Sequence, residues 1–331
     1  MNFLYIGPNS PGGTSSMRAM TLKKLLPDYE FTIIDTTIPF YKSNKIFRSI
    51  GFRFKTGPFI SALNNYILSN LGNITYNIIW VDKAIFIEPE VTKKMKQQSE
   101  LLIHYTPDCA FHINSSSLFN RSIEYYNWLI SSKIFEKKYY PVDKTLFSTQ
   151  GIHSNIHKPK FNFEDKYREV VFIGLYEKSR GDVVESLLLS GIKVTVAGKK
   201  WKHFKLLKHP NFEYLGEGLF SEEYASTISS SLFSLGLLSK KFPELHTTRT
   251  FEIPACGTVL ITERNEETSS YFNDKEVIFY NSFTEIPEKI KYYKAHLNEL
   301  QVMQELSLQK ASKYNYESIL KDLLVKMGVI V

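Results

Sequence analysis

Short apolar segments alternate with amphipathic segments along the chain, and this alternation constrains the fold more than any other feature of the sequence. β-Branched and aromatic runs predict buried strands, and apolar residues at helical spacing predict helices between them. The first half has predicted strands at 3–6, 31–34, 78–81 and 101–104, and predicted helices at 17–26 and 89–98. The second half has predicted strands at 170–173, 193–197, 232–237 and 258–262, a predicted helix at 182–190, and a helical pattern through 285–327. Strands that alternate with helices build parallel sheets, so the sequence predicts an α/β fold with doubly wound sheets.

The chain is long enough for two domains. Its 331 residues are too many for one small core and fit two domains of roughly 150 residues each. A polar, proline-containing stretch at 153–163 separates the two sets of predicted elements and is the expected hinge.

Cysteine content and apolar run lengths indicate a cytoplasmic location. Cys109 and Cys256 are the two cysteines, which favours a reducing compartment over a disulfide framework. The first residues lack the basic start and long apolar stretch of a signal peptide. They are predicted to form a buried strand instead. The longest apolar run, around 231–238, is well short of the roughly 18–20 residues of a membrane span.

The chain is basic, with a formal net charge of +7. Much of the excess lies in lysine clusters at 93–96, 137–138 and 199–208. These clusters are either solvated helix faces or a surface that attracts an anionic membrane leaflet or a polyanionic acceptor. No nucleic-acid recognition motif accompanies the charge, so a nucleic-acid partner is not expected.

The segment 244–262 carries the most informative local pattern. Glu244 and Glu252 stand eight positions apart, too far for both to share one helix face at i, i+4 spacing. The pattern predicts a loop with Glu244 that opens into a helix holding Arg249 and Glu252. The loop also contains a histidine and two hydroxyl side chains, His246, Thr247 and Thr248.

These residue types suit a nucleotide-sugar ligand. A helix N-terminus presents free N–H groups and a positive dipole end, which favour a diphosphate. Thr247, Thr248 and His246 could bind phosphate, Arg249 could add a forked cationic donor, and Glu252 could accept from ribose hydroxyls. The structural alternatives are a capping role for Glu252 and an interdomain salt bridge for Arg249.

Three further residues of the second half are candidates for the same site. Gly174 follows a predicted strand, where a glycine lets the backbone approach a ligand closely, and Arg180 could reach the diphosphate. Trp201 could pack near the nucleotide base. The alternatives are a simple turn, a solvated arginine and a core tryptophan.

Polar residues past the strands of the first half are candidates for catalysis. Asp108 is the first choice for a general base that deprotonates an acceptor hydroxyl, with a helix cap as the structural alternative. Asp82 also follows a strand, and His104 stands at a strand end, where a core histidine is the alternative.

The sequence of the 244–262 segment resembles that of the CgeB-like (spore maturation protein) group of GT-B glycosyltransferases. Its spacing is the Glu-x7-Glu signature of that superfamily, although the Gly-Phe-Gly that usually follows the first glutamate is missing here. Further matches follow in the same order at 79–83, 104–108, 126–130, 149–151, 157–159, 172–176 with Arg180, and Gly198 with Trp201.

The resemblance implies a GT-B fold, with two Rossmann-like doubly wound parallel-sheet domains facing a cleft. It assigns 1–157 to an acceptor domain, joined by a C-terminal helix at 312–331, and 158–311 to a nucleotide-sugar donor domain. The glycine-rich loop that GT-B enzymes aim at a substrate is matched by Gly12, Gly13, Thr14 and Ser15.

The expected function is transfer of a sugar from a nucleotide diphosphate-sugar donor to a hydroxyl acceptor. The acceptor would be a glycan or lipid-linked glycan of bacterial surface polysaccharide or glycoconjugate assembly. No Asp-x-Asp is present, and such paired carboxylates hold the divalent ion in metal-dependent transferases, so neither a metal nor a cofactor is expected. A sugar-nucleotide epimerase or hydrolase and a non-catalytic nucleotide-sugar-binding protein are the alternatives.

Overall fold

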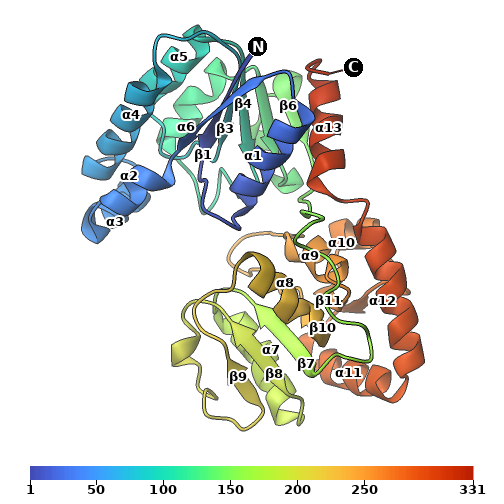
Figure 1. Cartoon of the computed structure of the whole chain (residues 1–331). Helices are drawn as coiled ribbons and strands as arrows, with labels where there is room; N and C mark the ends of the chain where they lie inside the picture. Colours follow the sequence, from blue (N-terminus) through green and yellow to red (C-terminus); the bar gives the residue numbers. More distant parts are fainter. Residues whose placement is uncertain (331) are drawn as a thin grey trace. The chain divides into compact units, whose positions relative to one another are not determined.

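A computed structural model describes residues 1–330, so the last residue of the predicted helix at 312–331 lies outside the described residues. The chain forms two compact units (Figure 1). Unit 1 contains Met1–Thr149 and the C-terminal segment that begins at Tyr316, and unit 2 contains Gln150–Asn315.

Unit 1 is built on a six-stranded parallel sheet. Its strands are β1 (Asn2–Gly7), β2 (Glu30–Asp35), β3 (Tyr76–Asp82), β4 (Ser99–Thr106), β5 (Trp128–Ser131) and β6 (Thr145–Phe147), in the order β2-β1-β3-β4-β5-β6. Every pairing is parallel, and Tyr5 lies opposite Trp80 in the β1–β3 register. The order reverses between β1 and β3, which is the switch point of this sheet.

Helices cover both faces of this sheet. They are α1 (Thr14–Leu25), α2 (Thr37–Lys42), α3 (Lys45–Phe54), α4 (Pro58–Leu71), α5 (Pro89–Gln97), α6 (Ser117–Ser122) and α13 (Tyr316–Lys326). Leu4 and Ile6 point to the face packed by α4, α5 and α6. Tyr5 points to the other face, where its hydroxyl hydrogen-bonds Ser15 of α1. Short 3₁₀ helices span Ile123–Tyr125, Ile134–Tyr139 and Val142–Lys144.

The first helix begins earlier than the sequence predicts. Gly12 has φ 73°, a left-handed conformation that glycine adopts without strain, and Gly13 is the residue before α1. Thr14 and Ser15 therefore belong to the first turn of α1, whereas the prediction kept them in a loop and began the helix at residue 17. The sequence does not mark this helix start, because Gly13 at the N-cap position has no side chain to cap the helix.

Unit 2 is built on a second six-stranded parallel sheet. Its strands are β7 (Arg168–Ile173), β8 (Val194–Ala197), β9 (Phe212–Tyr214), β10 (Ser231–Leu235), β11 (Val259–Glu263) and β12 (Ile278–Tyr280), in the order β12-β11-β10-β7-β8-β9. The order reverses between β7 and β10, which pair in parallel with Phe233 opposite Val170.

Two hydrophobic cores enclose the second sheet. Its helices are α7 (Lys178–Leu189), α8 (Ser221–Ser229), α9 (Arg249–Ala255), α10 (Glu266–Tyr271), α11 (Ile286–Ala295) and α12 (Leu297–Ala311), with 3₁₀ turns at Trp201–His203 and Phe283–Glu285. Alternate residues of β7 divide between the cores: Phe172 packs with α7 and α11, and Val171 packs with α8 and α9. The two sheets confirm the predicted α/β class.

Candidate functional site

The switch point of unit 2 brings the main candidates together. In open parallel sheets, ligands bind outside the carboxyl ends of the strands where the strand order reverses. Here these ends are Ile173 of β7 and Leu235 of β10, followed by Gly174 and by Gly236-Leu237.

Arg249 lies across this point. It is the first residue of α9, as predicted, and its guanidinium donates to the carbonyl oxygens of Ile173 and Leu237, each at 3.4 Å. Its buried Nε has no hydrogen-bond partner, and no carboxylate pairs with it within residues 1–330. A partly buried cation whose hydrogen bonds are long and that has no carboxylate partner is electrostatically unsatisfied and favours an anion.

Arg180 is the second guanidinium at this site. It lies in the first turn of α7, which begins at Lys178, whereas the sequence predicted a loop as far as 181. It pairs with Glu177 at 3.0 Å and donates to the Leu175 carbonyl oxygen at 3.0 Å.

Arg180 and Arg249 form a pair on one aromatic ring. Each guanidinium carbon is 5.9 Å from the ring centroid of Phe172. Burial lowers the pKa of Arg180, the Arg249 charge lowers it further, and Glu177 and Glu244 act in the opposite sense. Glu244 is therefore close enough to interact electrostatically with Arg180. A diphosphate bound at the two arginines would relieve the repulsion between them.

Close backbone packing shapes the floor of the site. A Cβ atom on Gly198 would lie 2.0 Å from the Gly174 carbonyl oxygen, and Gly198 has φ 142°, so only glycine fits there. Trp201 is 0% exposed, packs in the core with Phe172, and donates its indole N–H to the Gly174 oxygen at 2.8 Å. A base could not stack on Trp201 without displacing core side chains, so this tryptophan fixes the Gly174 loop.

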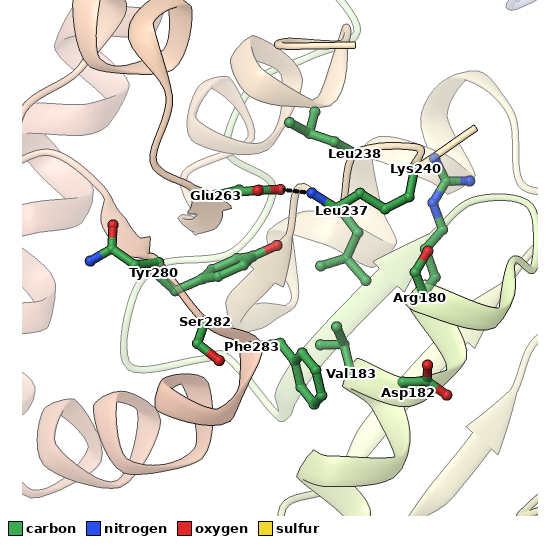
Figure 2. Close-up of a pocket in the computed structure, with 12 residues that line it drawn as sticks. Arg180, Asp182, Val183, Leu237, Leu238, Lys240, Glu263, Tyr280, Ser282 and Phe283 are labelled. Atoms are coloured by element: carbon green, nitrogen blue, oxygen red, sulfur yellow. Dashed lines mark hydrogen bonds and ion pairs between the residues drawn. The ribbon is translucent and has the colours of Figure 1, made fainter. Parts of the chain in front are cut away.

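A cavity of about 260 Å³ adjoins Arg180 at the carboxyl ends of β10, β11 and β12 (Figure 2). Arg180 and Leu237 line it together with Lys240, Glu263 and Tyr280. Figure 2 shows the Lys240–Glu263 ion pair at its rim and the ring of Tyr280 projecting into it. Both charges and apolar side chains therefore line a space next to Arg180.

Glu252 lies one helical turn after Arg249 and is only 5% exposed. Tyr224 donates to its Oε2 at 2.6 Å, and the Nε2 atom of His157 is 3.7 Å from its Oε1. The backbone N–H of His153 donates to Nδ1 of His157, so the neutral ring carries its proton on Nε2, facing Glu252. Burial lowers the pKa of His157, although Glu252 raises it, so the ring is neutral at pH 7.

The loop before α9 contains the other three candidates, His246, Thr247 and Thr248. His246 is buried and pairs with Glu267, so it anchors the loop to α10. The backbone N–H of Thr247 donates to the Thr250 hydroxyl, and the buried Thr247 hydroxyl oxygen has no hydrogen-bond partner among the described residues. Thr248 precedes α9 without a side-chain cap.

In unit 1, Asp108 follows β4 and is 42% exposed on its side chain. Lys83, which follows β3 with φ 63°, pairs with it at 2.8 Å. Burial raises the pKa of Asp108, but the nearby cations Lys83, Lys133 and Arg18 together lower it more, so the carboxyl titrates below its ordinary value. An ionised carboxylate at a strand end is compatible with a base, although its ion pair weakens its basicity.

An aromatic cavity of about 360 Å³ opens beside this ion pair. Its walls include Phe40, Tyr41, Phe52, Phe59 and Phe86, and its lining also contains Asp82, Lys83 and Asp108. Sequence patterns gave no indication of this space, because its walls come from α2, α3, α4 and the loop after β3.

The other two catalytic candidates are buried. Asp82 pairs with Arg18 at 2.7 Å and accepts from the Tyr5 hydroxyl at 2.7 Å. His104 packs against Phe119 and Tyr126, and burial lowers its pKa to about 3. Both sets of contacts are those of structural residues in the interior of unit 1.

Within residues 1–330, no cluster of three or more histidine, cysteine or acidic side chains has the geometry of a metal site. In the same part of the chain, every helix is too short or too polar to cross a membrane.

Comparison with known proteins gives a family match for the second half. Residues 180–324, which include Arg180, Arg249 and Glu252, match a family described as glycosyl transferase-like. No curated protein matches the sequence.

Solved structures with the same architecture extend over the whole chain. HepE from Anabaena in complex with UDP and glucose has a TM-score of 0.70 at 11% identity, with 100% of each chain covered. Sucrose-phosphate synthase from Thermosynechococcus elongatus has a TM-score of 0.69 at 11% identity, with 99% of each covered. A glycosyltransferase from Rickettsia africae has a TM-score of 0.65 at 12% identity, with 99% of this chain and 98% of that chain covered. The protein therefore has the GT-B glycosyltransferase fold, and its residues 180–324 match the glycosyl transferase-like family.

Proposed function

We propose that the protein is a glycosyltransferase that uses a nucleotide diphosphate-sugar donor. The observation that carries this proposal is Arg249, a partly buried guanidinium at the switch point of unit 2 that pairs with no carboxylate in the described chain. A diphosphate supplies the anion that this position lacks, and the position falls within the glycosyl transferase-like match.

The donor would be held by residues of unit 2. Arg249 and Arg180 would bind the diphosphate and stabilise its charge as it leaves, which is the main electrostatic demand of glycosyl transfer. Glu252 would accept from the ribose hydroxyls through Oε1, since Tyr224 holds Oε2. Thr247, Thr248, His246, Glu244 and the Gly174 loop would complete the site. UDP is the first nucleotide to test, because HepE was solved with it.

The acceptor would be bound by unit 1. We propose that its hydroxyl reaches Asp108 at the edge of the aromatic cavity, where the carboxylate would take the proton. Gly12, Gly13, Thr14 and Ser15, where the loop after β1 passes into α1, lie at the same end of this sheet.

We further propose that transfer occurs in the cytoplasm, at the inner face of the plasma membrane, in assembly of bacterial surface polysaccharide or glycoconjugate. The acceptor would be a glycan or lipid-linked glycan, and neither a metal nor a cofactor would be needed. Membership of the CgeB-like group remains our proposal from the motif resemblance.

A thermal-shift panel of nucleotide diphosphates and their sugars, followed by product analysis, tests the proposal. A glycosyltransferase should bind its donor and give net transfer to an added acceptor. Isomerised or hydrolysed donor without transfer would assign the protein as an epimerase or hydrolase. Binding with neither turnover nor slow hydrolysis would make it a non-catalytic nucleotide-sugar-binding protein.

A further inference from the structure

A long acid-free segment distinguishes unit 1. No aspartate or glutamate occurs between Asp35 and Asp82, whereas five cations lie within this stretch, Lys42, Lys45, Arg48, Arg53 and Lys55. All five belong to α2, α3 or the residue that follows α3, and none of them forms an ion pair within residues 1–330. This part of the molecule is therefore locally and strongly basic.

Apolar side chains are exposed on the same two helices. We call them the α2–α3 surface; they are Ile38, Tyr41, Ile46, Phe47, Phe52 and Phe54. Tyr41 is 69% exposed, Ile46 67% and Phe54 62%. Six such side chains in a segment of 17 residues, from 38 to 54, form a concentrated patch, whereas exposed apolar residues that are scattered singly are ordinary.

Helix α3 explains how the patch forms. Ile46, Ile50 and Phe54 recur every four residues and share one face, while Lys45 and Arg48 lie on another. A helix that packs on a core would bury such an apolar row. Instead, α3 packs on α4 through Gly51, whose added Cβ would lie 2.6 Å from Phe59, and Ile46 and Phe54 stay exposed. In Figure 1, α2 and α3 lie beside the lower end of α4, at the edge of unit 1.

We propose that the α2–α3 surface docks into the interface of an anionic lipid bilayer. Short amphipathic helices with aromatic and aliphatic residues on one face and cations on the other lie in the plane of the interface. The ten residues of α3 span about 15 Å, too short to cross a bilayer but suited to lying within its surface. The five cations supply the electrostatic attraction to anionic headgroups.

A second copy of the chain is a less suitable occupant. A two-fold dimer through this surface would place five cations against the same five cations, and no carboxylate of the segment could compensate them. An anionic bilayer satisfies both the apolar side chains and the charges.

The aromatic cavity of unit 1 is continuous with this surface. Tyr41 and Phe52 belong to both, and the cavity leads from them to Lys83 and Asp108. Docking would thus set the cavity mouth at the membrane, where a lipid-linked acceptor could enter. The docking locates the membrane contact proposed above on specific residues, and it does not depend on the transfer reaction.

Vesicle sedimentation tests the docking without measuring activity. The full-length protein should sediment with vesicles of mixed phosphatidylglycerol and phosphatidylcholine and be released at high salt. The double variant Ile46→Ser, Phe54→Ser should bind at least about tenfold more weakly, because each side chain loses its apolar contact. Leu189→Ser, which removes an exposed leucine of unit 2, is the matched control and should bind as the wild type does.

Charge variants and a spectroscopic probe complete the test. Lys45→Gln with Arg53→Gln should lose binding to the anionic vesicles, whereas Lys199→Gln with Lys200→Gln should not. Phe54→Trp should show fluorescence quenching by brominated lipid. A normal thermal shift with nucleotide diphosphate verifies that each variant is folded, and its absence in the wild type would count against the proposed function alone.

The proposal is overturned if the wild type fails to sediment with anionic vesicles. It is also overturned if the Ile46→Ser, Phe54→Ser variant binds them like the wild type. A concentration-dependent dimer that this variant dissociates, without vesicle binding, would assign the surface to a second copy instead.

Discussion

Tyr224 on α8 donates a hydrogen bond of 2.6 Å to Glu252 on α9. Burial raises the pKa of Tyr224, and the Glu252 charge raises it further, so the phenol keeps its proton. Glu252 is buried, and this hydrogen bond gives it a structural partner. Glu252 therefore has two separable roles, one in holding α8 against α9 and one proposed for the ribose.

Substitutions on the two sides of this hydrogen bond separate the roles. Glu252→Gln should weaken nucleotide diphosphate binding by about 1.5–3 kcal/mol, because it removes a charge-assisted acceptor. Tyr224→Phe should lower the free energy of unfolding by about 1–2 kcal/mol while Kd for the nucleotide changes little. Calorimetric titration and denaturant unfolding measure both effects, and equal losses of affinity in the two variants would leave Glu252 with only its structural role.

His104 should make unit 1 sensitive to acid. The folded protein keeps this ring neutral down to about pH 3, whereas the unfolded chain takes up a proton near the ordinary value of 6.5. Lowering the pH from 7 to 5 should therefore favour unfolding by about 2 kcal/mol through this residue. In His104→Leu this contribution should disappear, which urea unfolding at both pH values would show. Unchanged pH dependence would mean that His104 is solvated or paired in solution.

Asp108→Asn should reduce kcat on the order of 10²–10⁴-fold with little change in donor affinity if Asp108 is the base. Because Lys83 lowers the pKa of Asp108, the acid limb of the kcat/KM profile should lie below the ordinary aspartate value of 3.8. Lys83→Met removes the stabilising charge and should move that limb to higher pH. Near-wild-type turnover of Asp108→Asn would exclude this base and favour a mechanism that needs none.

Turnover should persist in excess EDTA. The expectation follows from the missing Asp-x-Asp and from the arginine pair, whose guanidiniums would neutralise the departing diphosphate in place of a divalent ion. Initial rates measured with and without chelator test it. Activity that disappears with EDTA and returns with manganese or magnesium would contradict the arginine model.

The sequence was sufficient for the longer strands, but it predicted neither α3 nor α4 and missed the shortest strands. Strands such as β1 and β11 are apolar and β-branched or aromatic. The predicted range 3–6 falls within β1, and the predicted range 258–262 begins one residue before β11 and ends one residue short of it. By contrast, β9 and β12 have three residues each, too few to show a period, and were not predicted. The start of α7 was missed because its first residues, Lys178 and Ser179, carry no cap signal.

The candidate site was likewise only partly predictable from the sequence. Spacing was enough to place Arg249 at the start of a helix, but the partner of Glu252 depends on Tyr224, 28 positions away in the chain. The shared ring of Phe172 under the two arginines likewise depends on the sheet order, which no local pattern specifies. The α2–α3 surface did leave a sequence signal, a segment rich in cations and aromatics without a single acid.

The central claim is that Arg249 binds the diphosphate of the donor, and calorimetric titration of Arg249→Ala tests it most directly. Arg249 pairs with no carboxylate among residues 1–330, so its removal should cost little stability. The variant should bind a nucleotide diphosphate such as UDP about 10–100-fold more weakly, while the free nucleoside should bind nearly as before. Arg264→Ala, which breaks the exposed Arg264–Asp274 pair in the same unit, should leave both affinities unchanged. A folded Arg249→Ala that binds UDP like the wild type, or that loses UDP and uridine equally, would contradict the claim.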